Sequence, residues 1–111
     1  MVTVKYESTL IYCDGPQVIL LEGHDNKTYL GVSVECNESY VKFFVIELFT
    51  DLYNSYSYRE IDLLTLINEC YSRTNLWFIT DISNYNADII LEEQYEPMKC
   101  VYLPDPEFYS Y

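Results

Sequence analysis

The only histidine of the chain, His24, is followed by Asp25, and this pair is the one place where a histidine-based catalyst could sit. Such a catalyst needs the imidazole within hydrogen-bond reach of a serine or cysteine and held by a carboxylate. The pair lies in a polar stretch, 23–27, between two apolar runs, which predicts an exposed hairpin tip that does not exclude water. We therefore expect His24 to be a turn residue without a catalytic role, and the protein not to be an enzyme.

Two neighbouring carboxylates, Glu92 and Glu93, are the other candidates for proton transfer. General acid–base work by paired carboxylates requires that one of them has a raised pKa. Consecutive residues of a strand point to opposite faces, so these two side chains do not form such a pair. We expect both to be solvated charges.

No metal or cofactor site is expected. The cysteines, Cys13, Cys36, Cys70 and Cys100, are far apart and form no C-x-x-C pair, which with a single histidine excludes a zinc site of the usual spacing. We expect most of them to be buried free thiols. The glycines, at positions 15, 23 and 31, do not open a helix with a following lysine, so the chain has no phosphate-binding loop.

The strongest signal is charge. The chain has 18 acidic and 6 basic residues and a formal net charge of −12. Nucleic acid and anionic membranes are bound through lysine and arginine, so the charge argues against both as direct partners and favours a protein with a basic surface. The last 31 residues hold seven acids and one lysine, a net −6, which is half of the excess. The alternative is that the charge serves solubility alone.

Tyrosine accompanies this charge, with 13 tyrosines in 111 residues. Tyrosine gives a large, rigid contact area with a polar tip and is enriched in recognition surfaces, although strands also favour aromatic residues. Acids and tyrosines of the C-terminal third, with a tyrosine cluster near residue 55, are therefore the predicted partner-binding residues: Asp81, Asp88, Glu92, Glu93, Tyr95, Glu96, Tyr102, Asp105, Glu107, Tyr53, Tyr56 and Tyr58.

The first half of the chain predicts four strands joined by polar turns. Residues 1–12 and 28–35 alternate between apolar and polar, which indicates half-buried strands. The continuous run from Val18 to Leu21, within 17–22, predicts burial on both faces, and 40–47 is a fourth apolar run. Asp14-Gly15-Pro16 between two such runs predicts a hairpin.

The second half predicts one main helix and two more strands. Apolar residues recur at helical spacing over 60–71, while 46–53 is either a short helix or the end of a strand and 54–58 a polar, aromatic loop. Strands are expected at 76–80 and 87–91. The predicted fold class is α+β: an antiparallel meander of five to six strands with one main helix packed across one face.

We expect a single domain, 1–111, organised as a β-meander (1–47), a helical segment (48–73), strands (74–91) and an acidic, tyrosine-rich tail (92–111). The chain has no apolar run near the roughly 20 residues of a membrane helix and no basic leader followed by an apolar core. A cytoplasmic location, in a bacterial or phage-infected cell, is the expectation.

Tyr12-x-Asp14-Gly15-Pro16, followed by an apolar run and Tyr29-Leu30, resembles a family of small uncharacterised bacterial and phage proteins with a Y-x-D-G-P strand–turn–strand opening. Arg59-Glu60-Ile61-Asp62-Leu63 is similar to the helix start of that family. The resemblance covers roughly residues 10–67 and consists of a turn, a core strand and a helix start. It implies a domain of unknown function and no activity.

Two functional hypotheses follow. The first is a small acidic inhibitor, of the phage or mobile-element anti-defence (anti-CRISPR-like) kind, that blocks a basic nucleic-acid-binding surface by charge mimicry. Carboxylates on alternate strand residues lie about 7 Å apart, a scale comparable with the roughly 3.4 Å rise between phosphates of a DNA strand. The second is an immunity, antitoxin or regulatory partner that docks through an aromatic–apolar patch, for which the tail residues 101–103 and 108–109 are the candidates.

Overall fold

The structure is a computed structural model that describes residues 2–12 and 15–97, except for the side chain of residue 16. The first four elements are strands, then two helices follow, and two strands complete the described chain. They are β1 (Val2–Tyr12), β2 (Pro16–Gly23), β3 (Thr28–Cys36), β4 (Val41–Leu48), α1 (Thr50–Ser57), α2 (Leu63–Thr74), β5 (Trp77–Ile82) and β6 (Ile89–Gln94).

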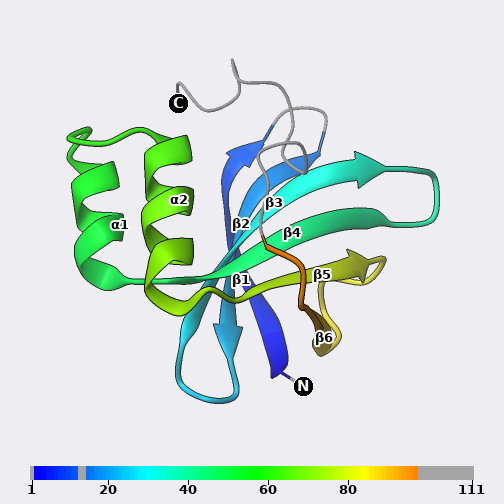
Figure 1. Ribbon diagram of the computed structural model, residues 1–111. Helices are drawn as coiled ribbons and strands as arrows, with labels where there is room; N and C mark the ends of the chain where they lie inside the picture. Colours follow the sequence, from blue (N-terminus) through cyan, green and yellow to red (C-terminus); the bar gives the residue numbers. More distant parts are fainter. Residues whose placement is uncertain (1, 13–14, 98–111) are drawn as a thin grey trace.

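The six strands form one antiparallel sheet in chain order, and β6 pairs with β1 to close it into a barrel (Figure 1). The closing ladder runs from Val2↔Leu91 to Val4↔Ile89. The predicted fold class, an open meander with one helix across it, is therefore wrong. Part of the physical reason lies in β1, whose register against β2 shifts three times, at 6–8, at 9–11 and at 11–12. Such bulges bend a strand and increase its twist, which brings the edges of a sheet together.

The inner face of the sheet carries the barrel interior, a buried cluster to which all six strands contribute. At Gly31, on this face, the lack of a side chain matters for packing. A Cβ at Gly31 would lie 3.0 Å from Cγ1 of Ile19 and 3.5 Å from Cδ1 of Phe43, so the glycine leaves room for two large side chains. The interior is filled by Val4, Ile19, Leu21, Tyr29, Phe43, Val45, Phe78, Ile82, Ile89 and Leu91.

A second buried cluster lies on the outer face of β2, β3 and β4, where α2 covers the sheet. Leu63, Leu66, Ile67 and Cys70 of α2 are fully buried there. These strands are thus buried on both faces, which confirms the prediction drawn from the run Val18–Leu21.

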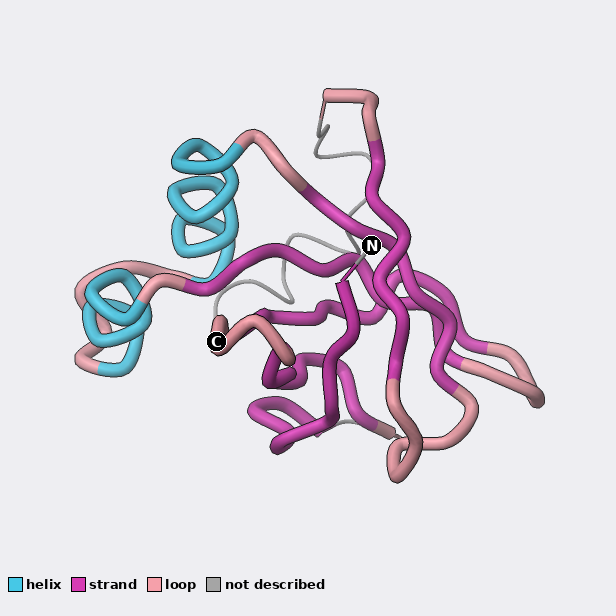
Figure 2. Tube along the Cα trace, turned by 90° about the horizontal axis from the view of Figure 1, so that it is seen from below, coloured by secondary structure: helices cyan, strands magenta, loops and turns pink. Residues whose placement is uncertain are grey.

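Both helices lie on the same side of the barrel (Figures 1 and 2). The predicted helix is present as α2, shifted by about three residues. Asp62 caps it by accepting a hydrogen bond from the Thr65 amide at 2.8 Å, and Asn75 ends it in the left-handed region at φ 56°. The prediction of a loop at 54–58 is wrong, because α1 continues through residue 57.

Strand β6 continues to Gln94, three residues into the segment expected to be the tail. The predicted partner-binding residues Tyr102, Asp105 and Glu107, and the predicted docking segments 101–103 and 108–109, lie outside the described residues. Neither helix in the described part of the chain is long and apolar enough to cross a bilayer.

Candidate protein-binding groove

Strands β5 and β6 separate soon after they pair. Their ladder has three residue pairs and ends at Ile79↔Glu92. Beyond that point β5 continues to pair with β4 as far as Ile82, whereas the first half of β6 pairs with β1. Thr80 spans the opening, since its Oγ1 donates a hydrogen bond to the carbonyl oxygen of Ile90 at 3.0 Å. We call this opening between residues 80–82 and 89–91 the seam.

A groove of about 720 Å³ follows the seam and the loop that joins the two strands. Consecutive residues of both strands line it. Its lining consists of Ile79, Thr80, Asp81, Ile82, Ser83, Asn84, Ala87, Asp88, Ile89, Ile90, Leu91, Glu92, Glu93 and Tyr95, which together we call the seam groove.

Four carboxylates, Asp81, Asp88, Glu92 and Glu93, line the seam groove, and no lysine or arginine among the described residues does. Within the described residues, none of Asp81, Glu92 and Glu93 has a basic side chain within 4.0 Å. Lys42 is the ladder partner of Asp81, but its Nζ lies 3.9 Å from Glu35 instead. Acidic side chains therefore outnumber basic ones in the described lining of the groove.

The other described ion pairs lie away from the groove. Lys27 Nζ is 3.6 Å from Glu47, and Arg73 makes two contacts with Asp51, at 2.9 and 2.5 Å. The Arg73 guanidinium lowers the pKa of Asp51, chiefly through these hydrogen bonds. Lys27 and Arg73 are thus paired with acids that do not line the groove.

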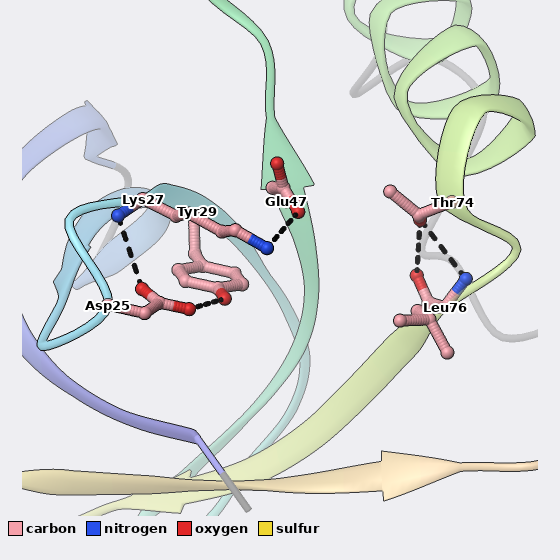
Figure 3. A network of polar contacts seen from close by, with 6 residues as sticks. All are labelled: Asp25, Lys27, Tyr29, Glu47, Thr74 and Leu76. Carbon is pink, nitrogen blue, oxygen red and sulfur yellow. Dashed lines mark hydrogen bonds and ion pairs between the residues drawn. The ribbon is translucent and has the colours of Figure 1, made fainter.

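His24 approaches the groove from the β2–β3 turn. Its Nε2 lies 3.6 Å from Asp88, and its backbone amide donates to the carbonyl oxygen of Thr3 at 3.0 Å. Asp25, the other half of the sequence pair, is not bonded to this imidazole. Its carboxylate accepts hydrogen bonds from the hydroxyl of Tyr29 at 2.8 Å and the amide of Lys27 at 3.1 Å (Figure 3).

These bonds set the protonation of the Asp25 network. Desolvation raises the pKa of Asp25, but the hydrogen bonds from Tyr29 and Lys27 outweigh it and leave the pKa below its usual value. The pKa of Tyr29 is raised well above its ordinary value, first by burial and then by its bond to Asp25. Tyr29 is 3% exposed and belongs to the barrel interior, so the network fixes the turn to the core.

The structure brings together five of the predicted partner-binding residues, the four carboxylates and Tyr95, which is 90% exposed. Glu92 and Glu93 are consecutive on β6, with Glu92 exposed opposite Ile79 and Glu93 half-buried opposite Phe78. Glu96 lies just beyond the groove, where its backbone oxygen accepts a bond from Nε1 of Trp77 at 2.6 Å.

The tyrosine cluster lies elsewhere, on α1 and the turn after it. Tyr53 and Tyr56 have ring centroids 6.4 Å apart and pack against the helix-covered cluster, and burial raises the pKa of Tyr56. Tyr58 is 78% exposed. A second groove of about 660 Å³ lies beside them and shares no residue with the seam groove; it is lined by Leu10, Ile11, Tyr56, Ser57, Arg59, Glu60, Ile61 and Asp62.

Charge and tyrosine content did not predict the apolar part of the seam groove. Ile79, Thr80 and Ile90 line it, and Ile90 is 58% exposed. In the sequence Ile90 stands within an apolar run, a pattern that is typical of a buried strand.

The predicted burial of the thiols holds for one of the two cysteines in the described part of the chain. Cys70 is buried, whereas Cys36 is exposed.

Three comparisons with known proteins give no match. A scan against protein-family models, a search of curated proteins and a search of solved structures each found none. The resemblance of the Y-x-D-G-P opening therefore stays a prediction.

Within the described residues no three histidine, cysteine or acidic side chains come together as metal ligands, so the groove carboxylates are spaced apart rather than clustered.

Proposed function

We propose that this protein is a small acidic inhibitor that binds a partner protein through the seam groove and covers a basic nucleic-acid-binding surface on it. The observation that carries the proposal is a groove with four carboxylates in its lining and, among residues 2–12 and 15–97, no lysine or arginine there. Uncompensated carboxylates on a rigid sheet attract a cationic surface at long range and raise the association rate. Anti-defence inhibition of the anti-CRISPR kind is the form of this activity that charge and size predict.

Apolar and aromatic groups beside the charges supply the contact area that charge alone does not. Ile90 and Tyr95, both on the groove, are 58% and 90% exposed. Buried aromatic and aliphatic anchors dominate the binding energy of protein interfaces, whereas exposed ion pairs contribute little each. In this proposal the exposed ring of Tyr95 takes the place of a stacked base on the partner.

The test compares two variants with the same net charge. Asp81→Asn/Glu92→Gln removes two groove charges, and Glu38→Gln/Glu69→Gln removes two exposed charges that do not line the groove. Each variant, immobilised, is incubated with a nuclease-treated bacterial extract, and captured proteins are quantified by mass spectrometry. A genuine partner is retained by wild type and by the control, is lost about tenfold or more with the groove variant, and is released by added duplex DNA.

Retention that is equal for both variants would refute the groove as the binding site. Retention that depends on the groove but persists in excess duplex DNA and in high salt would refute the blocking of a nucleic-acid surface.

A second candidate function, docking of an immunity- or antitoxin-type partner through an aromatic–apolar patch, is favoured by the groove beside α1. Leu10, Ile11, Tyr56 and Ile61 of its lining are apolar or aromatic, and Tyr58, which is 78% exposed, stands in the chain between Ser57 and Arg59 of the lining. Tyr58→Ser would abolish binding in this case, while Asp81→Asn/Glu92→Gln would leave it unchanged.

A further inference from the structure

We infer that His24 makes binding at the seam groove sensitive to pH, so that protonation of its imidazole weakens the hold on a cationic partner. This inference rests on the proposed function and specifies how the same site is regulated. Its starting point is a distance: Nε2 of His24 lies 3.6 Å from Oδ1 of Asp88, a carboxylate of the groove lining.

Backbone pairing holds the histidine beside the groove. The His24 amide donates to the carbonyl oxygen of Thr3 at 3.0 Å, one residue beyond the ladder pair Val4↔Gly23. On its other side Thr3 pairs with Ile90, which lines the groove. Val4 belongs to the barrel interior, so its neighbour Thr3 faces outward. His24, Thr3 and Ile90 therefore form one row across the outer face of the sheet.

Asp88 is the acid that the imidazole faces across this row. It belongs to the loop between β5 and β6, and both side chains of the pair are half-exposed. The next outward-facing acid on that side is Glu92, four residues farther along the chain. An imidazolium at this position therefore offsets the charge of Asp88 first.

The other charged groups around the histidine occur with opposite charges of their own. Asp25 is hydrogen-bonded within its turn, and Nζ of Lys27 lies 3.6 Å from Glu47 (Figure 3). On the adjoining strands Lys5 and Glu22 are ladder partners. Aspartate, glutamate and lysine keep their charges between pH 5 and 8, whereas histidine changes its charge in that range. A change in charge at this place therefore comes from His24.

The sign of the effect follows from the lining. With a neutral histidine, four carboxylates of the described lining face a cationic partner. With an imidazolium beside Asp88, one of the four charges is offset and the partner is attracted less. A unit charge about 6 Å away in a water-like medium changes affinity about threefold, which is the size of effect that we expect.

The probe for the test is a peptide of eight lysines with blocked ends, whose charge is constant over the range used. Its binding to the full chain is measured by calorimetry at low salt, at about pH 7.5 and about pH 5.5 and at equal ionic strength. His24 is the only histidine of the chain. His24→Gln removes the titrating group, and His24→Lys makes the positive charge permanent. His24→Gln/Asn54→His moves the histidine to an exposed position of α1 that does not line the groove.

We expect wild type to bind the peptide about threefold more weakly at the lower pH. His24→Gln should bind equally at both values, with the affinity of wild type at pH 7.5, and His24→Lys should bind equally and weakly at both. The variant with the moved histidine should resemble His24→Gln. Asp81→Asn/Glu92→Gln should weaken binding at both values, and Glu38→Gln/Glu69→Gln should do so less.

The outcomes separate the inference from the proposed function. Binding that depends on Asp81 and Glu92 but is equal at both pH values would overturn the inference alone, as would a pH dependence that persists in His24→Gln or returns with the moved histidine. Binding that the groove and control variants weaken equally would overturn the inference and the proposed function together. Absence of peptide binding to wild type would overturn the inference, and the capture experiment would then decide the proposed function by itself.

Discussion

Replacement of Gly23 by alanine should destabilise the protein through Asp25, two residues away. A Cβ at Gly23 would lie 2.2 Å from Oδ1 of Asp25 and 2.9 Å from Cε1 of Tyr29, so the carboxylate has to leave its place. It then loses its bonds to the Tyr29 hydroxyl and the Lys27 amide. The network that fixes the β2–β3 turn to the barrel interior is thereby removed.

The magnitude follows from those two bonds. Asp25 is exposed, so each bond contributes at the low end of the range for a charged acceptor, about 1 kcal/mol. The loss of chain entropy in the unfolded alanine variant offsets about 0.5 kcal/mol of the total. We expect the free energy of unfolding to fall by about 1.5 kcal/mol and Tm to fall by about 6 °C for a domain of this size.

The assay is urea unfolding at neutral pH, followed by the fluorescence of Trp77, the only tryptophan of the chain. A double-mutant cycle with Asp25→Ala isolates the mechanism, since Gly23→Ala should cost less than half as much once the carboxylate is absent. The lowered pKa of Asp25 means that its contribution is present above the unfolded pKa of about 3.9 and is lost as pH falls through the folded value. Wild type should therefore lose more stability than Asp25→Ala between pH 5 and 3. An equal cost of Gly23→Ala in both backgrounds would refute the reasoning.

Three further predictions concern the core, an unpaired hydroxyl and a helix cap. Leu66→Ala should lower the free energy of unfolding by about 2–5 kcal/mol in urea titrations, because Leu66 is fully buried between α2 and the sheet; a cost below 1 kcal/mol would contradict that packing. Tyr85→Phe should leave stability unchanged or raise it by about 1 kcal/mol in the same assay, since the Tyr85 hydroxyl is buried without a hydrogen-bond partner among the described residues; clear destabilisation would reveal a partner. Asp62→Ala should destabilise the protein at pH 7, because the capping bond to the Thr65 amide is lost. That loss should shrink as pH falls from the unfolded pKa of about 3.9 through the lower folded value, since the same bond lowers the pKa of Asp62, and a pH-independent cost would contradict the role as a cap.

The sequence predicted the elements whose signal is local. The run Val18–Leu21 has no polar alternation, and both faces of β2 are buried as that pattern implies. Helix α2 was visible from its apolar periodicity, and the side chain of Asp62 caps it. A short helix was one of the two alternatives predicted for 46–53, but the second half of α1 was missed because 54–58 is rich in asparagine, serine and tyrosine, which are weak helix formers. Its stability comes from Tyr53 and Tyr56 packing on the core, and that contact is tertiary.

Closure of the barrel was not predictable, because the decisive ladder joins residues 2–4 to residues 89–91. Hydrophobic periodicity describes which face a residue takes and carries no information about which strands meet. The candidate site was predictable only in part, because charge can be read from the sequence and the pairing of strands cannot. Charge pointed to Asp81, Asp88, Glu92 and Glu93 in the sequence, and all four line one groove, but their role in binding stays a prediction and the seam between them depends on where a ladder ends.

Strand β6 has six residues, of which the first three pair with β1 and the last three with β5. Detachment of this one strand breaks the ring on both of its sides at once and leaves β1 to β5 as a continuous sheet. The helix-covered cluster contains no residue of β6, whereas the barrel interior contains Ile89 and Leu91. Amide exchange should therefore divide the molecule into a slowly exchanging half under α2 and a faster half around β6, with barrel opening as a distinct event of lower free energy than global unfolding.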